Sequence, residues 1–244
     1  MYDNIVSLGY NCEVSFRIED YFGSLNAMPF SWSYTLDRDR FAGAIRAPKE
    51  IFSEGMRVND DHMLVCNRFE LKFHPRYSIL PQYGDYTQEQ ADEAYEELCG
   101  RIGHLTDKFV KLCAGDESTL FVMKVEDKGT EDNIKYIESV LAALTDVYRS
   151  GKFMLVAVPE KQAMNDELKK LENEHLKVFS VTKFAPRKHT NTMGDIAGWE
   201  RIFRTMSGAG SASYRKNVRA RRIEWVIDTV CRKLHINREH KEKK

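Results

Sequence analysis

The sequence predicts an α/β fold: a three-layer sandwich with a mostly parallel sheet, plus a small irregular or hairpin insertion near residues 24–86. Short apolar runs at 4–8, 119–125, 153–158 and 177–182 have the length and composition of buried strands. Segments with a helical spacing of apolar residues follow these runs, and this alternation is typical of a parallel sheet with right-handed crossovers. The chain of 244 residues, 42% of them hydrophobic, suffices for one sizeable core.

The helices and the remaining strands are expected between these runs. In chain order they are a helix at 12–22, a loop at 24–35, a helix near 37–46, paired strands at 62–66 and 69–74, a helix at 87–114, a helix from 130 to the Ser150-Gly151 stop, a helix at 160–174 and a helix from 195. Thr87 and Gln90 form a capping-box signature at the start of the long helix. Gly151 and Asp195 are typical end and start signals of helices.

The C-terminal part differs from the rest in charge. Residues 1–207 are expected to form one domain, followed by a basic amphipathic helix at 214–236 and a disordered tail at 237–244. Residues 215–244 hold 11 Lys or Arg against 4 Asp or Glu, whereas the whole chain has no net charge. The apolar residues of this helix form one stripe: Ile223, Val226, Ile227, Val230 and Leu234. We expect the stripe to dock on the domain; an anionic partner such as RNA or membrane lipid is the alternative.

The composition argues against several classes of protein. No segment resembles a signal peptide or a membrane span, because the apolar run at 4–8 is too short and follows Asp3. The five cysteines are widely spaced and form no CxxC pair, which favours reduced thiols in a cytoplasm over disulfides or a zinc site. We therefore expect a cytoplasmic protein with no metal, no other cofactor and no membrane contact, and we do not expect a nucleic-acid partner.

The turn after the first strand carries the main candidate site. Ligands of open α/β sheets bind at the carboxyl ends of the strands, where Cys12 follows the 4–8 run. A helix N-terminus favours a thiolate, so Cys12 could be a nucleophile at the exposed mouth of the turn. Ser7, Gly9 and Asn11 would bind substrate, with backbone N–H groups and the Asn11 amide as oxyanion donors. The alternative is a buried structural cysteine.

A nucleophilic cysteine usually works with a histidine. His74, at the end of the 69–74 strand, is the first choice for this base. His189, in a loop after the 177–182 run, is the second, and His62 is the third. For each of them an ordinary surface histidine is the alternative.

Three further residues are candidates for substrate binding. Lys124 ends the 119–125 run and would face the same carboxyl edge as Cys12. Ser31 and Trp32 belong to an apolar loop that either lines a pocket or fills the core. A polar loop without function is the alternative for Lys124.

Two motifs resemble a family of unknown function whose members are described as papain-like cysteine peptidases. They are Ser7-Leu-Gly-x-x-Cys12 and Pro29-Phe-x-Trp32, and Phe73-His74 matches as well. The runs Leu120-Phe-Val-Met-Lys124 and Phe153-Met-Leu-Val are weaker matches. The resemblance implies that Cys12 is the nucleophile and His74 its partner. Family members usually carry an aspartate where this chain has Ser31, and often an acid where it has Pro75. A papain-type enzyme packs its cysteine helix on an antiparallel barrel, whereas residues 119–206 predict repeated strand–helix units.

Two functional hypotheses follow. The first is a cysteine-dependent hydrolase or acyl-transferase that acts on a small-molecule or peptide substrate through Cys12 and a histidine base. The second is a non-catalytic α/β domain that binds a nucleotide or a sugar at the same strand ends, with a structural Cys12.

Overall fold

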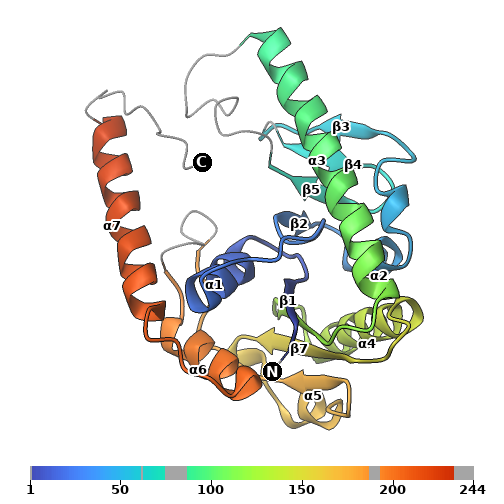
Figure 1. Ribbon diagram of the computed structural model, residues 1–244, viewed down its shortest axis with the longest axis vertical. Coiled ribbons are helices and arrows are strands. Elements are labelled where there is room, and N and C mark those ends of the chain that lie inside the picture. The colour runs from blue at the N-terminus through green and yellow to red at the C-terminus, as the bar shows by residue number, and fades with distance from the viewer. Residues whose placement is uncertain (1, 62, 75–86, 187–192, 234–244) are drawn as a thin grey trace.

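The computed structural model describes residues 2–61, 63–74, 87–186 and 193–233 and contains a four-stranded parallel sheet (Figure 1). Its strands, in spatial order, are β1 (Asn4–Ser7), β6 (Thr119–Val125), β7 (Phe153–Pro159) and β8 (Leu176–Val178). Each pair of neighbours is parallel, as the predicted alternation of strands and helices requires.

Helices cover both faces of this sheet, and the alternation of side chains along β6 explains how. Leu120 and Val122 pack on one face with α1 (Glu13–Phe22) and α6 (Ile196–Ser207). Phe121 and Met123 pack on the other face with α3 (Gln88–Ala114) and α4 (Thr130–Val147). Successive side chains of a strand point to opposite faces, so an unbroken apolar run serves two cores at once. The predicted three-layer α/β sandwich is confirmed.

The insertion near residues 24–86 contains a second sheet rather than a lone hairpin. Its antiparallel strands, in spatial order, are β2 (Ser33–Thr35), β5 (Leu71–Phe73), β4 (Leu64–Cys66) and β3 (Met56–Val58). The predicted pair of strands corresponds to β4 and β5, whereas β2 ends a segment expected to be a loop. Between β2 and β3 lie α2 (Arg38–Arg46) and the 3₁₀ turn η1 (Pro48–Glu50).

The helix expected at 160–174 is wrong in its extent. The chain forms a 3₁₀ turn, η4 (Lys161–Ala163), and then the short helix α5 (Asp166–Lys170). The break falls at Asn165, whose extended backbone and side-chain oxygen cap α5 by accepting a hydrogen bond from Leu168 N at 3.0 Å. The strand expected at 177–182 is likewise shorter, although a parallel bridge from Glu160 to Val181 continues its course.

The basic C-terminal helix, α7 (Tyr214–Lys233), docks through a different face from the one expected. Tyr214 and Val218, 0% and 6% exposed, pack in the core shared with α1 and α6. The stripe residues Ile223, Val226, Ile227 and Val230 are between 38% and 51% exposed. The docking prediction is therefore wrong: the aromatic first turn and polar contacts hold α7, and the stripe faces outward. Residues 234–236 and the tail at 237–244 lie outside the described residues.

None of the helices among the described residues is long and apolar enough to cross a membrane.

Candidate functional site

The turn between β1 and α1 has an unusual backbone. Gly9 and Tyr10 both adopt left-handed conformations, with φ of 59° and 66°. A Cβ on Gly9 would lie 3.0 Å from Thr35 Oγ1 and 3.2 Å from the Phe41 ring, so only glycine fits there. Tyr10 is held by a 3.3 Å hydrogen bond from its N–H to Thr35 Oγ1. A left-handed tyrosine costs about 1–2 kcal/mol, which points to a local role for this turn.

Cys12 lies at the N-terminus of α1 as predicted, but its thiol is not at an exposed mouth. The residue is only 7% exposed, and burial raises the pKa of the Cys12 thiol to about 12, although a hydrogen bond from the Tyr34 hydroxyl opposes this shift. Cys12 is the N-cap residue of α1, and Asn11, directly before it, accepts a hydrogen bond from Glu13 N through its Oδ1 at 2.9 Å. Desolvation thus outweighs the helix dipole, and the thiol is protonated at neutral pH.

His74 directly follows β5, and its ring lies against that of Tyr34, with 5.4 Å between the ring centroids. Burial, together with the charge of Lys72, lowers the pKa of His74 to about 4, so its imidazole is neutral at pH 7. Tyr34 contacts both residues, and we call Cys12, Tyr34 and His74 the cysteine cluster. The other two histidine candidates, His189 and His62, lie outside the described residues.

The remaining candidates from β1 and the 24–35 segment are Ser31, Trp32 and Ser7. Ser31 is fully buried, and its hydroxyl accepts a hydrogen bond from Met28 N at 3.0 Å, which closes the loop. Trp32 is half-buried and packs edge-on against Phe16, with ring centroids 5.1 Å apart. Ser7 is fully buried, and its hydroxyl has no hydrogen-bond partner among the described residues.

Lys124 is part of a buried charge cluster, of which the sequence analysis predicted Lys124 but not its partner Glu13. Its ammonium is 2.8 Å from Glu13 Oε2, and the side chains of both residues are at most 2% exposed. The same carboxylate accepts hydrogen bonds from Ala185 N at 3.1 Å and Trp199 Nε1 at 3.2 Å. Lys124 also lies 3.9 Å from the centroid of the Phe184 ring. Burial lowers the pKa of Lys124 despite its acidic partner.

Glu13 was missed, although two signals pointed to it. It lies in the first turn of the helix predicted at 12–22, where the dipole favours an acid. Lys124 is the only charged residue in the apolar run 119–125, and a buried lysine needs a counter-charge. The pair joins α1 to β6, so it fixes the position of the Cys12 turn on the sheet.

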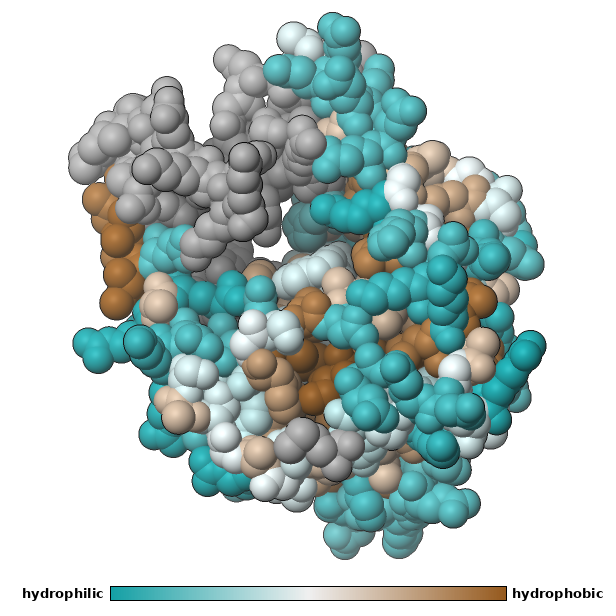
Figure 2. Space-filling model, viewed as in Figure 1, coloured by the Kyte–Doolittle hydropathy of each residue, from teal (hydrophilic) through white to brown (hydrophobic). Residues whose placement is uncertain are grey.

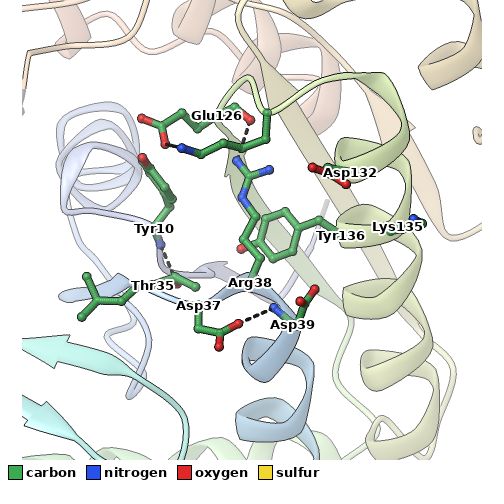
Figure 3. Close-up of a pocket in the computed structure, with 11 residues that line it drawn as sticks. Tyr10, Thr35, Asp37, Arg38, Asp39, Glu126, Asp132, Lys135 and Tyr136 are labelled. Carbon is green, nitrogen blue, oxygen red and sulfur yellow. Dashed lines mark hydrogen bonds and ion pairs between the residues drawn. The ribbon is translucent and has the colours of Figure 1, made fainter.

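A cavity of about 540 Å³ lies beside this turn, at the carboxyl ends of β1 and β6. We call it the carboxyl-edge pocket. Its lining residues come from the turn after β1, the start of α2, the loop after β6 and α4: Tyr10, Thr35, Leu36, Asp37, Arg38, Asp39, Glu126, Lys128, Asp132, Lys135 and Tyr136. Figure 3 shows Tyr10 and Tyr136 with the Arg38 side chain between them in this view. Cys12 does not line this cavity.

The cations of the carboxyl-edge pocket are already engaged. Arg38 donates to Asn133 Oδ1 at 2.9 Å and to the Glu126 carbonyl at 2.5 Å, and its guanidinium lies 4.9 Å from the centroid of the Tyr136 ring. Lys128 lies 3.7 Å from the Glu126 carboxylate. Lys135 pairs at 2.8 Å with Glu131, which is exposed.

The carboxylates of the carboxyl-edge pocket outnumber its cations. Four acids, Asp37, Asp39, Glu126 and Asp132, line the cavity against Arg38, Lys128 and Lys135. Asp37 caps α2 by accepting hydrogen bonds from Asp39 N and Arg40 N. Asp39 and Asp132 make no ion pair within the part of the chain that the structure describes, so their oxygens remain as acceptors for a ligand. Among the same residues, no group of three or more His, Cys, Asp or Glu is placed to hold a metal ion.

Comparison with known proteins assigns no family to this chain. No protein-family model matches it, and no curated protein and no solved structure is significantly similar to it. The function is therefore inferred from the carboxyl-edge pocket and the cysteine cluster.

Proposed function

We propose that this chain binds a hydroxyl-rich small molecule, a sugar or an amino sugar, in the carboxyl-edge pocket. The observation that carries the proposal is the cavity of about 540 Å³ at the ends of β1 and β6, lined mainly by polar side chains. Ligands of open parallel sheets bind at this edge, and the volume lies within the range of small-molecule sites. The left-handed backbone of Tyr10 at the rim agrees with a functional role.

The charges of the pocket favour a sugar over a nucleotide. Ionised carboxylates only accept hydrogen bonds, so Asp39 and Asp132 suit the hydroxyl or ammonium groups of a ligand. A phosphate would meet four carboxylates and three cations that already have partners. The Tyr10 ring, which is half-buried, offers an apolar face to the C–H groups of a sugar ring.

A matched ligand series tests this preference. Glucose, galactose and mannose are each compared with their 2-amino and 6-phosphate derivatives by thermal shift and isothermal titration. We expect the amino sugars to bind more tightly than the parent sugars, and the phosphates to bind most weakly, because the net charge of the pocket is negative. Tighter binding of the phosphates, or no binding by any member of the series, would overturn the proposal.

Variants at the two unpaired acids locate the site. Asp39→Asn and Asp132→Asn should each weaken binding of the best amino sugar by about ten- to a hundredfold, since a charge-assisted hydrogen bond contributes about 1.5–3 kcal/mol. Asp146→Asn is the control, because Asp146 is an exposed acid near the end of α4 that does not line the pocket. Equal affinity in all three variants would place the ligand elsewhere.

The second candidate function is cysteine-dependent acyl transfer, the activity implied by the family resemblance. The observation that favours it is the cysteine cluster, in which Cys12 at a helix N-terminus contacts Tyr34 of β2, and the neighbouring antiparallel strand β5 leads to His74. This combination of a cysteine helix and an antiparallel sheet resembles the papain arrangement. The high pKa of Cys12 weighs against it, since the thiol would have to lose its proton during attack rather than before it.

In this second candidate, the Cys12 sulfur would attack a carbonyl carbon while its proton passes to the neutral His74 imidazole. The Tyr34 hydroxyl donates a hydrogen bond to the thiol and the Tyr34 ring packs against the imidazole, so Tyr34 would hold the two groups in position. The protonated imidazole would then release the proton to the departing alcohol or amine, and water would hydrolyse the thioester. Hydrolysis of p-nitrophenyl acetate that Cys12→Ser abolishes and Cys99→Ser leaves intact would support this chemistry. Equal rates in both variants would exclude it.

We also propose a cytoplasmic location. Cys12, Cys66, Cys99 and Cys113 are free thiols in the described part of the chain. Free thiols persist in reducing compartments, where glutathione and thioredoxin keep them reduced. Fractionation of the producing cells tests the location, and recovery of the protein outside the cytoplasmic fraction would contradict it.

A further inference from the structure

The outward face of α7 carries an apolar surface that is exposed to solvent. Its four residues, which we call the α7 stripe, are Ile223, Val226, Ile227 and Val230, exposed by 51%, 46%, 38% and 48%. Their spacing of three and four residues places them on one side of the helix. Figure 2 shows the resulting hydrophobic patch at the left edge of the molecule, where Figure 1 shows α7.

The opposite face of α7 is fixed to the body of the protein. Asn217 donates to the Asp20 carbonyl at 2.8 Å, and Arg221 donates to Asp20 Oδ1 at 2.5 Å. Tyr214 is fully buried between α1 and α6. A partner that encloses a whole helix in a groove would have to break these contacts. A partner that needs only the outward face, such as a flat surface, leaves them intact.

The charge of α7 narrows the choice of partner. The helix holds seven Lys or Arg and two acids, Glu224 and Asp228. Lys216, Arg219 and Arg222 are exposed and make no ion pair with any residue that the structure describes. Two copies of α7 would repel each other, whereas an anionic surface attracts the helix. Apolar side chains flanked by free cations are the pattern of helices that lie in a membrane interface.

We propose that the outward face of α7 binds the surface of a bilayer that contains anionic lipids. The helix lies parallel to the membrane, the α7 stripe enters the boundary of the acyl chains, and Lys216, Arg219 and Arg222 meet the headgroups. This contact replaces the docking of the stripe that the sequence suggested, and it departs from the expected lack of membrane contact. It does not depend on the carboxyl-edge pocket.

Vesicle co-sedimentation of the full chain tests the proposal. We expect binding to phosphatidylcholine vesicles that contain phosphatidylglycerol, little binding to phosphatidylcholine alone, and a loss of binding as salt is raised. The double variant Val226→Ser/Val230→Ser should bind at least about tenfold more weakly, since each substitution removes apolar area from the stripe. The double variant Lys216→Gln/Arg219→Gln should weaken binding to vesicles that contain phosphatidylglycerol and leave the weak binding to phosphatidylcholine vesicles unchanged.

The control makes the same chemical change elsewhere. Val58 and Val110 are 48% and 36% exposed and lie on β3 and α3, so Val58→Ser/Val110→Ser should bind vesicles like the unchanged protein. Circular dichroism establishes that each variant is folded. Equal losses in both double variants, equal binding to neutral and anionic vesicles, or no vesicle binding at all would overturn the proposal. Self-association or RNA binding that is lost with the α7 stripe, in the absence of vesicle binding, would overturn it too.

Discussion

The buried charge cluster gives the sharpest prediction about stability. Glu13→Gln keeps the size of the side chain and an oxygen for Ala185 N or Trp199 Nε1, but it removes the counter-charge of Lys124. The ammonium, 2.8 Å from Glu13 in the unchanged protein, would then be buried without an anion. Breaking a buried ion pair in this way costs about 3–5 kcal/mol.

The energy of deprotonating Lys124 limits the cost of Glu13→Gln. A buried lysine can escape the cost by losing its proton, and for an ordinary pKa of about 10.4 this takes roughly 5 kcal/mol at pH 7. For a domain of this size the loss corresponds to a fall in Tm of about 6–20 °C. In Glu13→Gln the folded-state pKa of Lys124 lies below its unfolded value, so the unfolded chain binds more protons. The stability of the variant should therefore rise as the pH increases from 7 towards 10.

Urea unfolding followed by circular dichroism measures these values. The control is Glu131→Gln, because Glu131 pairs with Lys135 at the same 2.8 Å distance but is 83% exposed, and the loss of this solvent-screened pair should cost far less than the loss of Glu13. Adding Lys124→Met to Glu13→Gln should recover most of the lost stability, because it removes the orphaned charge. A cost for Glu13→Gln as small as that of Glu131→Gln would refute the argument.

Three further predictions concern the turn and the cysteine cluster. The pKa of Cys12 is about 12 against 9.0 for an ordinary thiol, so its thiolate fraction at neutral pH is about a thousandfold reduced. Iodoacetamide should therefore label Cys12 far more slowly in the folded chain than in the urea-unfolded chain. Rapid labelling of the folded chain, with an apparent pKa below 8, would contradict this. His74 has a pKa of about 4 in the folded chain against 6.5 for an ordinary histidine, so the unfolded chain binds more protons between these pH values. The free energy of unfolding should therefore fall by about 3 kcal/mol as the pH drops from 6.5 to 4. His74→Gln should lack this part of the pH dependence, and an unchanged dependence of stability on pH in the variant would show that His74 is not the cause. Gly9→Ala should lower the free energy of unfolding in urea by about 2 kcal/mol, because of the left-handed φ of Gly9 and the contact of a Cβ with Thr35. The control Gly210→Ala should lower it little, since a Cβ there meets nothing closer than 3.9 Å. Equal losses in the two variants would mean that the turn tolerates a side chain.

The parallel sheet could be predicted because its signals are local. β6 and β7 are seven-residue apolar runs, and β6 is followed by α4, a helix with a clear pattern of buried residues. β2 and β3 could not be predicted in the same way. Each has three residues, too few to show an alternation, and all three residues of β3 are exposed. Their strand conformation depends on partners that are distant in sequence.

The position of Cys12 followed from the sequence, but its protonation state did not. The strand, the turn and the helix start are encoded within a dozen residues. The burial of the thiol and its hydrogen bond with Tyr34 arise from the second sheet, which local patterns do not reveal. The same holds for the pair of Glu13 and Lys124, and for the carboxyl-edge pocket, whose walls come from four separate segments.

We propose that the ligand site is the carboxyl-edge pocket and not the Cys12 thiol. A crystal structure of the chain with the tightest-binding amino sugar tests it most directly. We predict ligand density beside Tyr10, with hydroxyl or ammonium groups on the carboxylates of Asp39 and Asp132 and an unmodified Cys12. Density at the Cys12 sulfur, or an empty carboxyl-edge pocket in a crystal that holds the sugar elsewhere, would contradict it.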